Sequence, residues 1–211
     1  MSVVTLTISS DGAAIPETVA VVSVDVRFEL NRVPAATLVL LDGDIASQAF
    51  PVSDGGLFDP GKSVDIKARY EDQPSSEARI FKGVVVRQAL QSSSHGTLLR
   101  VELRDQAVKL TTPRRSRVME QRSDSDLVGD LLREAKVASG VLKATTLVHQ
   151  TVVQYDCSDW DLIVSRAEAN GLVVTVAEGQ LSMVEPVGSG SAVLKVQYGV
   201  DEVYEVEWNA Q

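Results

Sequence analysis

The stretch QYDCSDWDLIVSRAEANG, residues 154–171, contains in order the signals of a short strand, a capped helix and a glycine stop. Ser158 is a preferred N-cap residue, and Asp161 three positions later completes the spacing of a capping box. Apolar residues then recur at helical spacing, at Trp160, Ile163, Val164 and Ala167. Gly171 can adopt the left-handed conformation that ends a helix without steric cost. We therefore predict a helix between Ser158 and Gly171 that packs against the strand LVVTVA, which follows directly.

The composition is that of a water-soluble globular protein. Of 211 residues, 44% are hydrophobic and 23% are charged, which is enough material for one domain or two small ones. No apolar run approaches the roughly 18 residues that a membrane-spanning helix needs. The first residues, MSVVTLTISSDG, have neither the basic start nor the apolar core of a secretory signal. The single cysteine, Cys157, excludes an internal disulfide and is compatible with folding in a reducing cytoplasm.

The net charge of −9 is distributed unevenly along the chain. Residues 106–155 carry a net charge of +3, whereas residues 156–211 carry −8. This segregation predicts that a basic middle segment faces an acidic end, within one chain or between subunits. Arg114, Arg115 and Arg117 are the candidate interface residues of that basic segment. An acidic chain with only 5% aromatic residues is unsuited to nucleic acid, which rewards basic surfaces and stacking rings.

The first half of the chain predicts an antiparallel sheet that curls into a barrel or sandwich. Alternating or β-rich runs separated by polar turns are found at 3–8, 22–30, 36–41, 64–70, 79–91 and 97–104. The interior is expected to be aliphatic, with Phe28 and Phe81 among the core residues.

The run of strand-like segments ends near Asp105. Residues 111–122 read as a basic connector, after which Ser123 caps a second helix that we expect Gly140 to end. The remaining strands are expected at 147–155, 172–177, 180–184, 192–198 and 202–208. The predicted fold class is therefore mainly β with two short helices.

Residue types that support catalysis or metal binding are present without the spacing that such sites need. Asp156, Asp159 and Asp161 surround a helix start, where capping and the helix dipole favour carboxylates without an ion. His95 and His149 lie too far from Cys157 to form the close-spaced ligand pairs of a zinc site. A reactive thiol at Cys157 would lack a nearby base. A pair of carboxylates for glycoside hydrolysis is an alternative that the sequence leaves open, because any acidic chain contains candidate residues. We expect no cofactor, no metal and no catalytic residues.

Several ordered segments resemble the hub region of contractile-injection spike proteins. The motif Q-Y-x-x-S-D-W-D followed by SRAEANG resembles that region in VgrG proteins of type VI secretion, extracellular injection systems and contractile phage tails. Further matching pieces lie upstream in the same order, so the resemblance spans nearly the whole chain. They are LVLLDGD (38–44), FDPG (58–61), IFKGVVVRQ (80–88), LRVELRDQAVKLT (99–111) and SDSDLVGDLL (123–132).

The resemblance implies a non-enzymatic structural hub that connects an inner tube to a piercing spike. It implies a barrel-like tube module over residues 1–105, a helix-containing insertion over 106–190 and the start of a second barrel-like module at 191–211. It also implies a homotrimer, with the tube protein, baseplate and spike-tip proteins as partners and effector cargo in some systems. Assembly is expected in the bacterial cytoplasm, followed by export with the particle on firing.

The sequence departs from full-length hubs, which continue into the rest of the second module and often into a needle. We therefore expect either a portion of a longer hub or a hub whose spike is a separate chain. The alternative functions are a baseplate-associated cell-wall hydrolase and a monomeric carbohydrate-binding β module. The residues with an expected structural role are the helix-capping positions Ser123, Ser158, Asp161 and Gly171.

Overall fold

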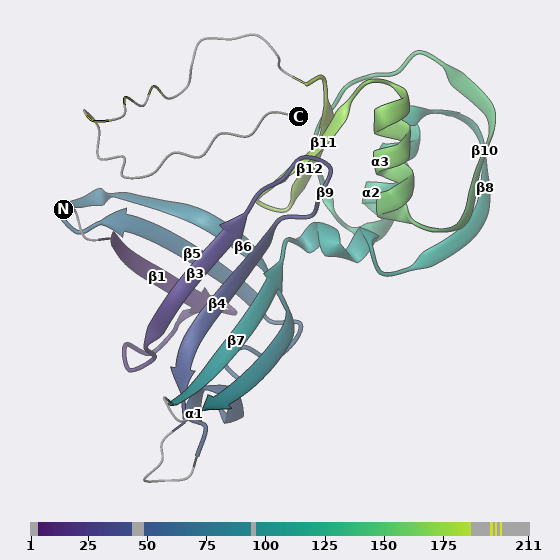
Figure 1. The fold of residues 1–211 in the computed structure, drawn as a ribbon. Coiled ribbons are helices and arrows are strands. Elements are labelled where there is room, and N and C mark those ends of the chain that lie inside the picture. Colours follow the sequence, from purple (N-terminus) through teal and green to yellow (C-terminus); the bar gives the residue numbers. More distant parts are fainter. Residues whose placement is uncertain are drawn as a thin grey trace.

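The computed structural model describes residues 4–43, 49–93 and 96–186, together with positions 195, 197 and 199. The predicted strands at 192–198 and 202–208, the predicted module at 191–211 and the position of His95 lie wholly or mostly outside these residues. Within them, a large curled sheet and a smaller helix-containing part lie side by side (Figure 1).

The large sheet has seven antiparallel strands in the order β2-β1-β5-β6-β7-β4-β3. Their bounds are β1 Val4–Ser10, β2 Ala13–Ala14, β3 Val21–Arg27, β4 Ala35–Asp42, β5 Ser63–Tyr70, β6 Gln73–Ser93 and β7 Gly96–Arg104. The sheet curls without closing, because among the described residues the edge strands β2 and β3 form no ladder with one another. The predicted mainly β fold class is confirmed, with a short helix α1 (Pro51–Asp54) that the sequence did not predict.

Alternation places the apolar residues of this sheet on its concave side. Leu38, Leu40, Ile66, Val101 and Leu103 are fully buried there. Residues of the 49–62 segment, including Phe58 and Val52, pack on the same core. Strand periodicity therefore predicted this core from the sequence alone.

The predicted burial of Phe28 is wrong. Phe81 is 3% exposed, but Phe28 is 58% exposed, with its ring centroid 6.4 Å from that of Phe81. The strand ends at Arg27, whose partner Ala35 is the first residue of β4. Pro34 has no N–H with which to extend the ladder, and Asn31 turns the chain with a φ of 58°.

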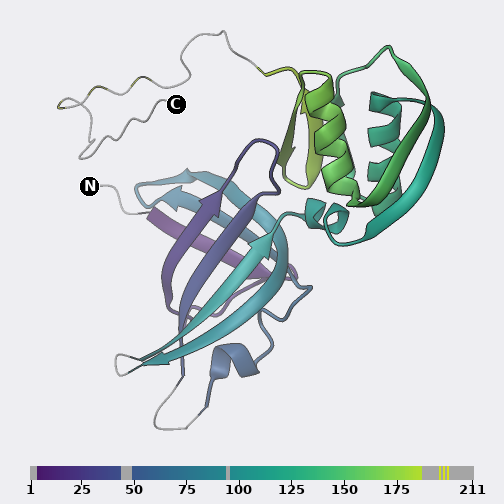
Figure 2. The ribbon, with the colours of Figure 1, turned by 45° about the vertical axis from the view of Figure 1, so that its right-hand side comes forward.

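The smaller part combines two helices with two sheets. A two-stranded ribbon pairs β8 (Arg114–Ser123) with β10 (Val148–Ser158), and a second sheet has the order β11-β12-β9. The other bounds are η1 Gln106–Leu110, α2 Asp124–Ala135, β9 Ala138–Leu142, α3 Asp159–Ala169, β11 Val173–Ala177 and β12 Gln180–Val184. The ribbon wraps around one side of α2 and α3, and the three-stranded sheet lies on their other side (Figure 2). The apolar faces of all these elements form a second core.

Both predicted helices are present, with serine caps. Ser158 and Asp161 form the complete capping box of α3, and Gly171 follows the helix with a φ of 66°. Ser123 accepts a hydrogen bond from the backbone N–H of Asp126 at the start of α2. The prediction that Gly140 ends α2 is wrong, because Lys136 takes the left-handed cap conformation with a φ of 54°.

Two strands of this part were not predicted. Residues 114–123, expected to be a connector, form β8, and Gly140 lies inside β9. A Cβ at Gly140 would lie 2.3 Å from Oγ of Ser182, so a larger residue there would displace the Ser182 hydroxyl. The pairing of β9 with β12 is parallel and joins segments about 40 residues apart, which local periodicity does not reveal.

A few polar side chains join the two parts. Backbone N–H of Asn31 donates to the carbonyl of Val174 at 2.9 Å, and Val174 N–H donates to Asn31 Oδ1 at 2.8 Å. Buried Asp105 accepts from the N–H groups of Ala107 and Gly179, both at 2.9 Å. The sheet and the helical part are thus fixed to one another through directed hydrogen bonds near residues 31 and 105.

Candidate functional site

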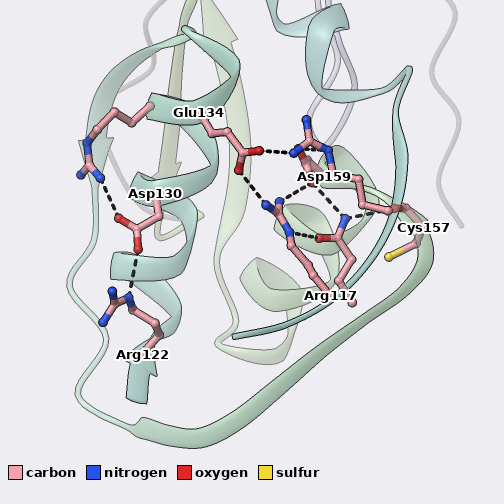
Figure 3. A network of polar contacts seen from close by, with 9 residues as sticks. Arg117, Arg122, Asp130, Glu134, Cys157 and Asp159 are labelled. Atoms are coloured by element: carbon pink, nitrogen blue, oxygen red, sulfur yellow. Dashed lines mark hydrogen bonds and ion pairs between the residues drawn. The ribbon is translucent and has the colours of Figure 1, made fainter. Parts of the chain in front are cut away.

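The densest polar cluster of the helical part lies beneath the ribbon (Figure 3). Alternation along β8 turns Arg115 and Arg117 toward the helices, where they meet Glu134 of α2 and Asp159 of α3. Asp159 is the first residue of α3 and its side chain is 2% exposed. The capped start of α3, predicted from Ser158 and Asp161, therefore positions the buried carboxylate.

Arg117 is the centre of this cluster, and its guanidinium has a partner on each side. It donates to Glu134 Oε2 at 2.6 Å, to Asp159 Oδ1 at 2.8 Å and to Gln154 Oε1 at 2.7 Å. Gln154 in turn donates to Asp159 Oδ1 at 2.9 Å and to the carbonyl of Cys157 at 3.0 Å. Arg115 donates to the second oxygen of Glu134. The arrangement ties both strands of the ribbon to both helices.

Arg114 points the other way. Its guanidinium pairs with Asp156 at 3.1 Å, and both side chains are largely exposed. The structure therefore brings Arg115 and Arg117 together but places Arg114 on the opposite face of the ribbon. The role of the three arginines at a subunit interface stays a prediction, and Arg114 is the one positioned to reach another molecule.

A second buried cluster joins the start of α2 to the end of α3. Asp124 accepts from Arg166 Nε at 2.6 Å and Nη2 at 3.0 Å, and from Asn170 Nδ2 at 2.8 Å. His149 of β10 lies 3.1 Å from the same carboxylate. Burial alone would raise the pKa of Asp124, but hydrogen bonds from Arg166, Asn170 and His149 hold it well below its ordinary value. This carboxylate is thus held ionised as a structural anchor.

The more exposed carboxylates of α2 are also paired with arginine. Asp130 accepts from Arg133 at 2.7 Å and from Arg122 at 3.0 Å. Figure 3 shows Asp130 and Arg122 joined by a dashed line. Hydrogen bonds from these arginines lower the pKa of Asp130, and those from Arg117 and Arg115 lower the pKa of Glu134. Burial raises the pKa of Asp105, despite the two backbone N–H groups that it accepts from.

The free energy of unfolding is expected to fall in acid. For Asp124, Asp130 and Glu134 the folded pKa is lowered, so their contribution is complete above the ordinary values of 3.8 and 4.5 and is lost as the pH falls through the folded values. Asp105 acts in the opposite direction, because a raised folded pKa makes proton uptake stabilising. Asp42 acts like the first three, because hydrogen bonds from the backbone N–H groups of Val52, Ser53 and Gly43 outweigh its burial and lower its pKa. Four carboxylates with a lowered pKa oppose one with a raised pKa, so we expect a net loss of stability on acidification.

Urea titrations at several pH values between about 6 and 2.5 measure this dependence. The variant Asp124→Asn should show a shallower loss than the parent chain over the same interval. A free energy of unfolding that does not change with pH in the parent chain would contradict the assignment of these carboxylates as structural anchors.

The described residues do not converge on a catalytic arrangement. No group of three or more histidine, cysteine, aspartate or glutamate side chains among them could hold a metal ion. A cleft of about 910 Å³ lies between the outer face of the large sheet and α3 and is lined by side chains of both charges, among them Arg104 and Glu168. Trp160 is its one aromatic lining residue and is 8% exposed. Within the described part of the chain, no helix has the length and apolarity to cross a membrane.

Sequence reasoning found the arginines and the caps but missed the acidic and amide side chains that pair with the arginines. Asp159 was interpreted only through its favourable place at a helix start, and Gln154, Glu134 and Asp124 were not singled out. Glu134 lies seven residues after Leu127 on α2, two helical turns along the same face, and this spacing was the only local signal of its position. Nothing local in the sequence indicates which arginine lies opposite which acid, because the pairs are 17 to 42 residues apart.

Comparisons with known proteins place the chain in a family. A family model described as the Alg8 N-terminal domain matches residues 1–210. The chain belongs to the Alg8 N-terminal domain family. No curated protein sequence matches this Alg8 N-terminal domain.

Solved structures share the fold of this Alg8 N-terminal domain at low sequence identity. The 43 kDa tail protein of prophage MuSo2 from Shewanella oneidensis has a TM-score of 0.64 at 11% identity, over 86% of this chain and 53% of that chain. The E. coli c3393 protein, described as a type VI secretion component similar to T4 tail proteins gp27 and gp5, has a TM-score of 0.60 at 16% identity, over 83% and 48%. A chain of the Francisella PdpA-VgrG complex has a TM-score of 0.59 at 11% identity, over 87% and 29%.

These likenesses confirm, at the level of the fold, the resemblance to VgrG-like tail hub proteins. The Alg8 N-terminal domain spans about half the length of the first two of these chains and less than a third of the last.

Proposed function

We propose that the chain is a structural component of a contractile injection particle, the hub that connects the inner tube to the piercing spike. The observation that carries the proposal is the fold, which matches tail and secretion-spike proteins over 83 to 87% of the chain. The polar clusters agree with a structural role, since hydrogen bonds from arginine hold Asp124, Asp130 and Glu134 ionised rather than prepared for proton transfer.

In this proposal residues 1–105 form the module that faces the tube, and residues 106–190 form the helical insertion. Three copies would assemble, and a second similar module in each copy would provide six contacts to a six-fold tube. Subunit contacts in such a ring are heterologous and close after three copies. The particle would assemble in the bacterial cytoplasm and leave the cell with the tube on firing, together with baseplate, spike-tip and, in some systems, effector partners.

The alternative functions have no comparable support in the geometry. A cell-wall hydrolase needs two carboxyl groups of opposite protonation facing one cleft. Asp124, Asp130 and Glu134 all have a lowered pKa, and the oxygens of Asp105, whose pKa burial raises, accept from backbone N–H groups at the junction. A carbohydrate-binding module uses exposed aromatic rings along a groove, whereas Trp160, the one aromatic residue of the 910 Å³ cleft, is buried.

The decisive measurement is the mass and shape of the full natural chain in solution. Light scattering after size exclusion should give a multiple of three copies, and negative-stain images should show a ring. Addition of the tube protein from the same gene neighbourhood should produce a larger complex that can be isolated. A monomer that forms no ring and does not bind the tube protein would overturn the proposal.

A further inference from the structure

The cleft between the large sheet and α3 has two unlike walls. Its sheet wall carries Arg100, Glu102 and Arg104, which point outward from β7 because they alternate with buried residues. The facing wall includes Trp160 and Val164 of α3. Its volume of about 910 Å³ lies within the range of about 300–1,000 Å³ that ligand pockets of proteins occupy. A charged wall thus faces a largely apolar one across a space that can hold a ligand.

The acidic side chains that line this cleft already have partners. The four pairs are Asp25 with Arg27 (2.8 Å), Glu29 with Arg32 (3.1 Å), Glu102 with Arg87 (3.4 Å) and Glu168 with Asn31 Nδ2 (3.2 Å). A cationic ligand would have to compete with these partners for a carboxylate. The cleft is therefore poorly prepared for a positively charged group.

Two arginines of the sheet wall can accept a further partner. The side chain of Arg104 forms no ion pair or hydrogen bond with another described residue. Arg100 is 57% exposed and lies 3.9 Å from Glu102 Oε1, the same oxygen that Arg87 approaches to 3.4 Å. A guanidinium has five N–H donors and commonly holds a carboxylate through two parallel hydrogen bonds. Each of the two arginines can therefore bind an incoming carboxylate.

The spacing of these arginines selects an extended ligand. Arg100 and Arg104 are four residues apart on β7, which corresponds to about 13 Å at roughly 3.3 Å per residue. Acidic side chains at positions i and i+4 of an extended peptide have the same spacing, whereas in a helix they are only about 6 Å apart. The side chain midway between them would meet Glu102 and must not be acidic. Side chains that point the other way face α3, where Val164 favours apolar residues.

The same wall is unsuited to the phosphates of nucleic acid. Glu102 stands between the two arginines, so a backbone with a charge at every nucleotide would bring a phosphate against it. Bases would also lack a ring to stack on, because Trp160, the one aromatic residue of the cleft, is 8% exposed. The chemistry of the cleft therefore favours carboxylates carried by a polypeptide.

We propose that the cleft binds an extended acidic segment of a partner protein. Two carboxylates of that segment, four residues apart, pair with Arg100 and Arg104, and the apolar side chains between them pack on Val164. This site goes beyond the proposed hub function and does not depend on it, because one copy of the chain provides both walls.

Two labelled synthetic peptides of the same composition test the spacing, with the full natural chain as the receptor. The first, Ser-Glu-Val-Thr-Val-Glu-Ser, has its glutamates at the required spacing and an uncharged threonine midway. The second, Ser-Val-Glu-Glu-Thr-Val-Ser, has its glutamates side by side. Fluorescence anisotropy should show saturable binding of the first peptide that is at least tenfold tighter than binding of the second, a difference of about 1.4 kcal/mol.

Charge variants of the sheet wall test whether the peptide lies in the cleft. Arg104→Glu should weaken binding of the first peptide at least tenfold, whereas Glu102→Gln should strengthen it, because Arg100 is then free to pair with the peptide alone. Arg69→Glu is the matched control. Arg69 lies on β5 of the same sheet and has no ion pair with a described residue, but it does not line the cleft. In about 0.15 M salt, which screens distant charges, this variant should bind like the parent.

Four outcomes would overturn the inference, provided that circular dichroism shows each variant to be folded. The first two are equal affinity for the two peptides and unchanged binding by Arg104→Glu. The third is a duplex DNA oligonucleotide that binds as tightly as the first peptide and is lost equally in Arg104→Glu, which would indicate a general polyanion site. The fourth is self-association of the parent chain that Arg104→Glu abolishes in sedimentation equilibrium, which would assign the cleft to a second copy. Ring formation and tube binding are measured separately, so failure of the hub proposal is distinguishable from failure of this one.

Discussion

Replacement of Asp124 by alanine is expected to lower the free energy of unfolding by about 3–5 kcal/mol, the usual cost of removing one partner of a buried ion pair. The carboxylate is 2% exposed and accepts four hydrogen bonds or close contacts, from Arg166, Asn170 and His149. Its loss leaves the guanidinium of Arg166, only 25% exposed, without a counter-ion. It also disconnects the first turn of α2 from the last turn of α3. Equilibrium urea unfolding measures the change.

Asp130→Ala is the matched control for this substitution. Asp130 also lies on α2 and also pairs with two arginines, but its side chain is 43% exposed and the arginines are more exposed still. Water and salt screen such pairs, so the expected loss is less than about 1 kcal/mol. Equal losses for Asp124→Ala and Asp130→Ala would contradict the interpretation that burial, and not the number of partners, sets the cost.

Replacement of Asp105 by alanine is expected to cost about 2–4 kcal/mol, because the N–H groups of Ala107 and Gly179 each lose their acceptor. Both groups lie in or near the junction between the large sheet and the helical part. We therefore also expect the cooperativity of unfolding to decrease, so that calorimetry resolves two transitions in place of one.

Two further variants calibrate the Asp105 result. Asp105→Asn keeps one carbonyl oxygen and can accept from only one of the two N–H groups, but it also removes a buried charge, so its loss should be smaller than that of alanine. Ser182→Ala removes the acceptor of the Val141 N–H at an exposed site, where water replaces it, and should cost less than about 1 kcal/mol. A single sharp transition for Asp105→Ala, with a loss no larger than that of Ser182→Ala, would show that the junction does not depend on Asp105.

Local pattern predicted the elements whose neighbours in sequence are also their neighbours in space. The hairpins β3–β4, β6–β7 and β11–β12 and the caps of α2 and α3 all follow from residues within one turn or two strands. Strand β8 was missed because both of its inward positions before Met119 are arginines, so the alternation gives no apolar face that the sequence pattern could reveal. Those arginines are tolerated beneath the ribbon only because Glu134 and Asp159 lie opposite them.

The candidate site was predictable only in outline for the same reason. The sequence indicates a basic segment, an acidic segment and two capped helices, and the tertiary fold alone determines that Arg117 meets Asp159 across 42 residues. The end of α2 shows a second limit. A lysine in the left-handed cap conformation is uncommon, and Gly140 four residues later offered the more usual signal.

Strand β4 cannot complete its pairing while the chain is still short. The side of β4 that does not face β3 pairs with β7, with Ala35 opposite Arg104 and Asp42 opposite Thr97. In the sequence, β5 and β6 lie between β4 and β7. The growing polypeptide must therefore emerge past residue 104 before the two hairpins can join. Such long-range closure slows folding and leaves strand edges exposed to neighbouring nascent chains. Synthesis of this protein should consequently be sensitive to translation rate and to chaperones that shield unpaired strands.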